Sequence, residues 1–133
     1  MKASLIFIAL FFFIKIDTFS QSWSFIGRNT KNEVYYIRKY STVSSSTKIW
    51  IKFVSKSVSY TKRGKTLYIN GYSISLYDTD CLGRRLNIRG ITTYSASGNL
   101  VNSWSKEEYE DDWNEVIPDS VGEMFLEKAC EIL

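Results

Sequence analysis

The sequence predicts an α+β fold, in which one antiparallel β-sheet of about five or six strands is followed by a single C-terminal α-helix. Two observations carry this prediction. Apolar and polar residues alternate with a period of two over most of residues 22–104. A helical pattern comes only at the end, where Ser120 and Glu123 have the spacing of a capping box just after Pro118. Short turn-like segments separate the strand candidates, so we expect a meander.

The clearest strand candidate is residues 48–55, in which every second residue is apolar. One face would carry Ile49, Ile51 and Phe53, and the other Lys48, Trp50, Lys52 and Val54. The other candidates are residues 22–27, 33–38, 72–80, 85–95 and 100–104. Gly90 interrupts the alternation in one of them and indicates a bulge. For residues 56–71 two interpretations stay open, a small hairpin or a long mobile loop.

The helix is predicted to begin after Ser120. The Ser120 side chain would accept a hydrogen bond from a backbone N–H of the first turn, while Glu123 would reach back to the Ser120 N–H. The apolar stripe of the helix consists of Val121, Phe125 and Ala129, with Leu126, Cys130 and Leu133 beside it. We expect this stripe to pack on one face of the sheet, with Glu127 and Glu131 facing outward.

The first 20 residues have the pattern of a secretory signal peptide. Lys2 precedes an apolar run of 10 residues, 5–14, and small residues at Thr18 and Ser20 suit cleavage before Gln21. An uncleaved anchor would need roughly 17 to 25 apolar residues. We therefore expect a signal peptide at 1–20, one domain at 21–133 without a membrane-spanning segment, and a location outside the cell or in the periplasm or cell envelope. No cysteine lies near the cleavage site, so a lipobox is absent.

Cys81 and Cys130 are the only cysteines of the chain. In an exported protein a disulfide is the default for such a pair. The bridge would close a loop of 48 intervening residues, which on the chain-entropy estimate stabilises the fold by about 4 kcal/mol. Two free thiols or a metal-binding pair are the alternatives, although the chain has no histidine to complete a zinc site.

Few residues are suited to catalysis. General acid–base chemistry most often uses histidine, which the chain lacks. Asp78 and Asp80 stand two apart on a predicted strand, and acidic residues crowd 107–112. Either set could bind calcium, and the aspartates could also form an acid pair, but a solvated strand end and a solvated loop are simpler explanations. We predict a protein that is not an enzyme, with no cofactor and no metal ion.

Charge is unevenly distributed along the chain. Residues 28–89 carry 13 basic and 3 acidic residues, whereas residues 106–133 carry 2 basic and 10 acidic ones. Either the acidic segment folds back onto the basic sheet, or a basic face attracts anionic partners. Tryptophan concentrates at protein-binding hot spots. The predicted binding residues are therefore Trp50, its neighbours Lys48 and Lys52, and the turn residues Lys62 and Arg63. A nucleic-acid partner is not expected for an exported chain.

Six motifs follow one another in a recognisable order: W-S-F-I-G from Trp23, V-Y-Y-I from Val34, I-W-I-K from Ile49, L-Y-D-T-D-C ending at Cys81, Y-S-A-S-G-N from Tyr94, and W-N-E-V-I-P-D-S-V-G-E from Trp113, with Cys130 after it. In this order they resemble the bacterial surface-adhesin protein E-like domain family. The resemblance covers nearly all of residues 21–133, and the last motif with its cysteine is the most specific part.

This resemblance implies an antiparallel sheet with a C-terminal helix tied to it by a Cys81–Cys130 disulfide, and a capacity to form homodimers. The family's namesake is a surface lipoprotein that binds host extracellular-matrix proteins and plasminogen, whereas this chain lacks a lipidation cysteine. We therefore expect an exported, non-enzymatic binding or adhesion module that contacts a host or extracellular protein. The alternative is a periplasmic or cell-envelope subunit that binds another bacterial protein.

Overall fold

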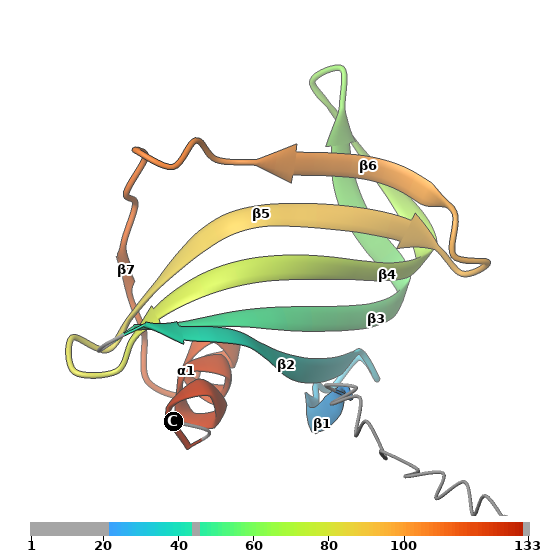
Figure 1. Ribbon diagram of the computed structural model, residues 1–133. Helices are drawn as coiled ribbons and strands as arrows, with labels where there is room; N and C mark the ends of the chain where they lie inside the picture. Colours follow the sequence, from blue (N-terminus) through green and yellow to red (C-terminus); the bar gives the residue numbers. More distant parts are fainter. Residues whose placement is uncertain (1–21, 44–45, 132–133) are drawn as a thin grey trace, which may run out of the picture.

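The computed structural model describes residues 22–43 and 46–131, which form one antiparallel sheet with a helix packed against it (Figure 1). The elements of these residues are β1 (Ser24–Arg28), β2 (Val34–Val43), β3 (Ser46–Lys62), β4 (Lys65–Asp80), β5 (Arg85–Ser95), β6 (Leu100–Ser105), β7 (Asn114–Glu115) and α1 (Val121–Glu131). The fold class expected from the sequence is confirmed. The predicted signal peptide at 1–20 and the predicted helix residue Leu133 lie outside the described residues.

The strands lie antiparallel in the order β1-β2-β3-β4-β5-β6, so the predicted meander is confirmed. β7 pairs with the first two residues of β5, a part of β5 along which β6 does not run. The predicted bulge at Gly90 is also confirmed, because Leu76 pairs with Gly90 and the next residue of β4, Tyr77, pairs with Ile88. Arg89 is thus the extra residue of the bulge.

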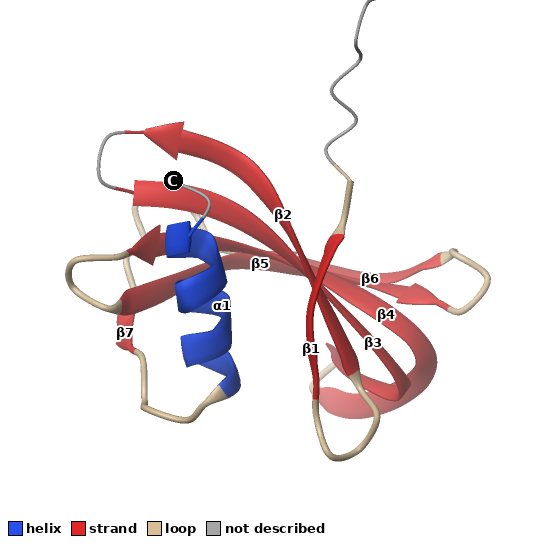
Figure 2. Cartoon of the chain, turned by 90° about the horizontal axis from the view of Figure 1, so that it is seen from below, coloured by secondary structure: helices blue, strands red, loops and turns tan. Residues whose placement is uncertain are grey.

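Residues 56–71 form the far part of the β3–β4 hairpin, so the hairpin interpretation is correct. The pairing of the two strands continues past a bulge that begins at Ser55. At the tip, Arg63 and Gly64 have φ values of 51° and 73°, the backbone of a two-residue hairpin turn in which glycine is favoured. Figures 1 and 2 show that this part bends away onto the side of the sheet where α1 lies. We call residues 58–69 the hairpin arm.

The bend requires a glycine at position 71. Gly71 pairs with Ser55 of β3 on one side and with Ser95 of β5 on the other. A Cβ atom at Gly71 would lie only 2.0 Å from the carbonyl oxygen of Tyr94. No side chain fits at that distance, so β4 and β5 approach closely only because residue 71 has none.

The hydrophobic core lies between α1 and one end of the sheet. Its buried residues are Ile37, Ile49, Ile51, Leu86, Phe125, Leu126 and Ala129. The ring of Phe125 lies between two tyrosines, with centroids 5.5 Å from Tyr35 and 5.8 Å from Tyr77. Burial, and to a smaller extent the neighbouring Tyr35, raises the pKa of the Tyr77 hydroxyl. The alternation predicted for residues 48–55 is confirmed, since Ile49 and Ile51 are buried under the helix.

The helix begins close to where it was predicted. The Ser120 side chain accepts a hydrogen bond from the Glu123 N–H at 3.2 Å, as expected of an N-cap. The return bond differs from the prediction: the Glu123 carboxylate accepts from the N–H of Asp119, at 2.7 Å. Asp119 has a φ of 59°, so the chain turns sharply there and presents that N–H to the helix start.

The prediction that Val121 belongs to the packed stripe is wrong, because its side chain is 40% exposed. It borders a cavity of about 400 Å³ between the helix start and β5, which α1 leaves unfilled. The outward positions of Glu127 and Glu131 are confirmed, since both are exposed.

A disulfide joins Cys81 to Cys130, with the two Cα atoms 5.9 Å apart. It connects the turn after β4 to the last turn of α1, and neither cysteine is free. The predicted disulfide is therefore confirmed, and the alternatives of free thiols or a metal-binding pair do not hold in this structure. The helix is held to the sheet by this bond as well as by the core.

Candidate functional site

No helix among the described residues covers the sheet face opposite α1, and Figure 2 shows α1 on one side of the sheet only. The strand register defines the side chains of this face, because directly paired residues point to the same side. We call it the open face. Its residues include Tyr36, Arg38, Lys48, Trp50, Lys52, Tyr72, Ile74, Leu76, Asp78 and Tyr94, together with Trp23 just before β1.

Cationic and aromatic side chains form a continuous row across the open face. The Arg38 guanidinium lies 5.0 Å from the centroid of the Trp23 ring, and Lys52 Nζ lies 6.0 Å from the same ring. Lys52 Nζ is also 4.5 Å from the Tyr72 ring, which stacks on Tyr94 at 5.0 Å. We call these five residues the cation–aromatic ladder. Within the described part of the chain, Arg38 and Lys52 contact ring faces and form no ion pair, so their charges stay available.

Two further predicted binding residues, Lys48 and Trp50, lie beside the ladder. Trp50 meets the ring of Tyr40 edge-on at 5.6 Å, and Tyr40 is 54% exposed. Lys48 Nζ lies 3.9 Å from a carboxylate oxygen of Asp78, and its side chain is 44% exposed. The structure thus places Lys48, Trp50 and Lys52 together on one accessible surface.

The other two predicted binding residues lie elsewhere. Lys62 and Arg63 are exposed at the tip of the hairpin arm, at the far end of β3 from Lys48. The arm bends to the side of the sheet that carries α1, away from the open face (Figures 1 and 2). The five predicted binding residues therefore lie in two separate regions, the open face and the tip of the hairpin arm. They are separated because β3 continues as a strand through the bulge and then bends.

Four ladder residues were not among the predicted binding residues: Trp23, Arg38, Tyr72 and Tyr94. Alternation within a strand shows which side chains of that one strand point to the same face of the sheet. It does not show that Tyr72 lies next to Lys52, since that depends on the register between β3 and β4. The only feature of the sequence that pointed to these four residues was the frequency of aromatic residues in strand candidates that also carry Lys or Arg.

The acidic run is held at the border of the open face by Arg89. This side chain forms an ion pair with Asp78, which is only 6% exposed, and a second with Asp111 at 2.9 Å. It also donates to the carbonyl oxygen of Glu110 at 3.0 Å. The hydrogen bond to Asp78 is the main cause that raises the pKa of Arg89. Part of the acidic segment therefore folds back onto the basic sheet. This was one of the two explanations considered for the uneven distribution of charge along the sequence.

Asp78 and Asp80 do not act as a pair, because a different arginine holds each. Asp80 accepts from Arg85 Nη2 at 2.6 Å and from the Gly83 N–H at 2.8 Å. The Gly83 hydrogen bond, followed by that of Arg85, lowers the pKa of Asp80. These contacts stabilise the turn that carries Cys81. Among the described residues, no group of three or more His, Cys, Asp or Glu side chains could hold a metal ion.

The family described as surface-adhesin protein E matches residues 23–131, from the first residue of the ladder to the end of α1. The chain belongs to this family. The resemblance seen in the sequence motifs is thereby confirmed over nearly the whole described structure. Comparison with curated proteins and with solved structures gives no match. No helix in residues 22–43 and 46–131 is long and apolar enough to cross a membrane.

Proposed function

We propose that the chain is an exported, non-enzymatic binding module that contacts an extracellular protein through the open face of its sheet. The observation that carries the proposal is the cation–aromatic ladder, a row of half-buried large side chains on the sheet face that no described helix covers. Membership of the surface-adhesin protein E family supports an adhesin-like role.

The residue types of the open face suit a protein partner. Tryptophan, tyrosine and arginine are the side chains that most often dominate the energy of protein interfaces, since they bury much area at a small entropic cost. The rings of the ladder hold one another in place, so little ordering is required when a partner binds. A preorganised aromatic surface of this kind favours a protein over a small ion.

The charges of the open face suit a partner that presents carboxylates. Arg38, Lys48 and Lys52 lie within one surface, and Lys48 has only a long contact with Asp78. Arg89 keeps Asp111 of the acidic run at the border of this surface. Complementary charge steers association and selects among partners. We therefore infer that the partner carries acidic residues around an apolar patch.

The test is a binding titration of the exported protein, labelled with a fluorophore, against extracellular-matrix proteins and plasminogen at physiological salt. Saturable binding to at least one of them is expected. Lys52→Met keeps most of the stem that packs between Trp23 and Tyr72 but removes the charge. It should weaken binding about tenfold, equal to about 1.4 kcal/mol.

Lys31→Met is the matched control, because Lys31 is an exposed lysine in the turn before β2 and lies outside the ladder. It should leave the affinity unchanged. If none of the probes binds saturably to the folded protein, the adhesin proposal is wrong. If both lysine variants lose affinity equally, binding depends on net charge and not on the open face.

Export and final location need a separate experiment. We propose that residues 1–20 are removed as a signal peptide and that residues 21–133 are displayed outside the cell. Protease treatment of intact cells that express the full chain should then degrade the protein. Protection until the cells are breached would favour the alternative, a subunit inside the envelope that binds another bacterial protein.

A further inference from the structure

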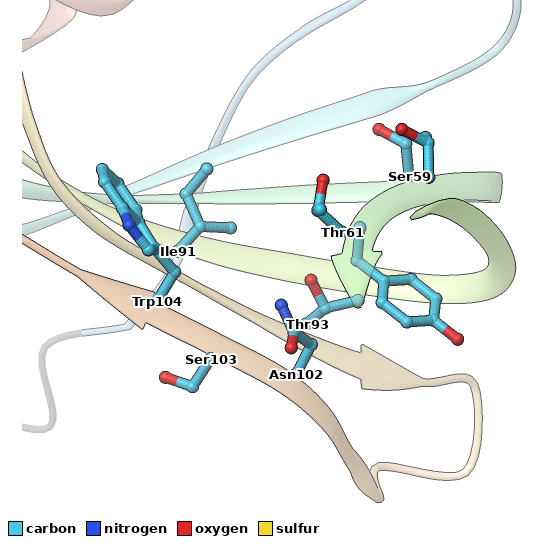
Figure 3. Close-up of a pocket in the computed structure, with 9 residues that line it drawn as sticks. Ser59, Thr61, Ile91, Thr93, Asn102, Ser103 and Trp104 are labelled. Carbon is cyan, nitrogen blue, oxygen red and sulfur yellow. The ribbon is translucent and has the colours of Figure 1, made fainter. Parts of the chain in front are cut away.

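A cavity of about 580 Å³ lies between the hairpin arm and β6, at the end of the sheet away from α1. Its floor comes from β5 and its wall from β6. Trp104 pairs with Ile91, and Asn102 pairs with Thr93, so these four side chains point to one side. Figure 3 shows them rising into one hollow, with Thr61 of the hairpin arm facing them. This volume falls within the roughly 300–1,000 Å³ of small-molecule sites.

The cavity lies on the opposite side of the sheet from the open face. Thr93 pairs with Ser73, and Ser73 pairs with Phe53, whose ring packs against Tyr35 beside the helix core. The side chains of the cavity therefore share the face that α1 covers at the other end. A ligand here would not compete with a protein on the cation–aromatic ladder.

The lining is polar but carries no charge. The nine residues around the cavity include hydroxyl side chains, one amide, an indole and an isoleucine, and none of the nine is Lys, Arg, Asp or Glu. Lys62 follows Thr61 and pairs with Lys65, so alternation directs both lysines away from the side to which Thr61 points. An anionic ligand would find no counter-charge in the lining.

Several polar groups of the lining lack a partner. Thr93 is only 1% exposed, and its hydroxyl has no hydrogen bond within the described residues. The side chains of Thr61, which is exposed, and of Asn102, which is half-buried, also form no hydrogen bond with the described residues. By contrast, the hydroxyl of Ser103 bonds to Thr92 at 3.1 Å and points away from the hollow in Figure 3. Buried donors and acceptors are costly unless they are paired. A purely apolar ligand would leave Thr93 and Asn102 unpaired, so the ligand must itself carry hydroxyl or amide groups.

The indole of Trp104 supplies a platform beside these polar groups. It is 47% exposed and lines the cavity, so its ring is accessible to a ligand there. The face of an aromatic ring is electron-rich and attracts the weakly positive C–H bonds of a flat, hydroxylated ring. Sugars combine such a C–H face with a rim of hydroxyl groups. We propose that this cavity binds an uncharged saccharide, stacked on Trp104 and hydrogen-bonded to Thr61, Thr93 and Asn102.

The test uses the ¹⁵N-labelled protein recovered after export and follows the indole N–H signal of Trp104 by NMR. Cellotriose, maltotriose and the trimer of N-acetylglucosamine are the neutral probes, and a heparin tetrasaccharide is the acidic one. At least one neutral probe should shift the Trp104 signal saturably, with a dissociation constant in the millimolar range or tighter. The heparin fragment should bind more weakly or not at all.

Thr93→Val removes one hydroxyl at almost constant volume and should weaken binding roughly tenfold, as expected when one buried hydrogen bond is lost. Trp104→Ala should abolish binding, measured through shifts of backbone N–H signals. Leu100→Ala is the matched control, because Leu100 is an exposed apolar residue of the same strand that does not line the cavity. It should bind like the unaltered protein.

Three results would overturn the proposal. One is that no neutral probe shifts the Trp104 signal in protein whose spectrum shows it to be folded. Another is that Thr93→Val and Trp104→Ala, both folded, bind the probe as well as Leu100→Ala does. The third is that only the heparin fragment binds, which would assign the interaction to exposed cations such as Lys62 and not to the cavity.

Discussion

The two ends of the sheet face that α1 covers share one alternation of side chains but differ in chemistry. At one end the inward positions carry Ile49, Ile51 and Tyr77, which pack against the helix. Further along the same face they carry small or polar residues such as Ser73 and Thr93. The helix fills the first end, and the hairpin arm leaves a cavity over the second.

The difference shows that the composition of the inward positions matches what lies over them. An apolar row must be buried against another element, and α1 provides that element. A polar row gains little from burial and tolerates a solvent-filled cavity. The stability of the fold should therefore reside at the helix end, while the cavity end should tolerate change.

The largest expected effect is at the helix end. Phe125 is 7% exposed and contacts both Tyr35 and Tyr77. Phe125→Ala should lower the free energy of unfolding by about 3–5 kcal/mol, because it opens a cavity in the core. Ile91→Ala, at the cavity end, should cost clearly less, since Ile91 is only partly buried. Urea denaturation of both variants checks this, and equal losses would contradict the contrast between the two ends.

Loss of the disulfide should also act at the helix end. Cys130→Ser should lower the free energy of unfolding by about 2–5 kcal/mol. Hydrogen exchange should show that α1 loses protection before the strands of the hairpin arm do, because the bond anchors the last turn of α1. Peptide mapping without reduction should recover Cys81 linked to Cys130. Finding two alkylatable thiols in the exported protein would refute the pairing.

A smaller effect is expected where the hairpin bends. Gly71→Ala places a methyl group against the Tyr94 carbonyl and should cost roughly 1–3 kcal/mol. The NMR signals of the hairpin arm and of Trp104 should move, while those of α1 stay in place. Gly122→Ala is the matched control, because its Cβ would meet no atom closer than 3.5 Å. Similar losses in both variants would mean that the bend does not depend on Gly71.

The smallest effect concerns the pH dependence at the turn before β5. The pKa of Asp80 is lowered below its ordinary value of 3.8, so its charge stabilises the folded state at neutral pH. That contribution is lost as the pH falls through the lowered pKa. Asp80→Asn should therefore be less stable than the unaltered protein at pH 7, and the difference should shrink as the pH is lowered from 7 to below 3.8.

Thermal unfolding across this pH range measures the effect. Glu127→Gln serves as the control, because Glu127 is an exposed residue of α1 with no ion pair among the described residues. A difference between Asp80→Asn and the unaltered protein that grows on acidification would contradict the assigned role of Asp80.

The sequence predicted those parts of the fold that depend on neighbouring residues. The strand at 85–95, the bulge at Gly90 and the Ser120 cap all follow from local rules and are confirmed. Val121 was misplaced because a helical stripe shows which residues share a side, but not how far the helix overlaps the sheet. The predicted partner of the Glu123 carboxylate was the N–H of Ser120, but the structure has the N–H of Asp119. The positive φ of Asp119, which presents this N–H, cannot be inferred from a capping motif.

The candidate surfaces were predictable only in part. Lys48, Trp50 and Lys52 were predicted to share a face because they alternate within one strand. Lys62 was grouped with them because it is basic and belongs to a turn, but the bend of the hairpin carries it away. The cavity was not foreseen at all, because Thr61 and Asn102 are far apart in sequence and meet only through the fold.

By itself, the sequence determined the order and type of the elements, the only pair of cysteines and the alternation along each strand. These are properties of short segments, set by backbone geometry and by where each side chain must point. The tertiary structure alone decided which strand lies beside which, where β3 and β4 bend, and therefore which side chains meet. Registers between strands are long-range contacts, and both the ladder from Trp23 to Tyr94 and the cavity beside Trp104 depend on them.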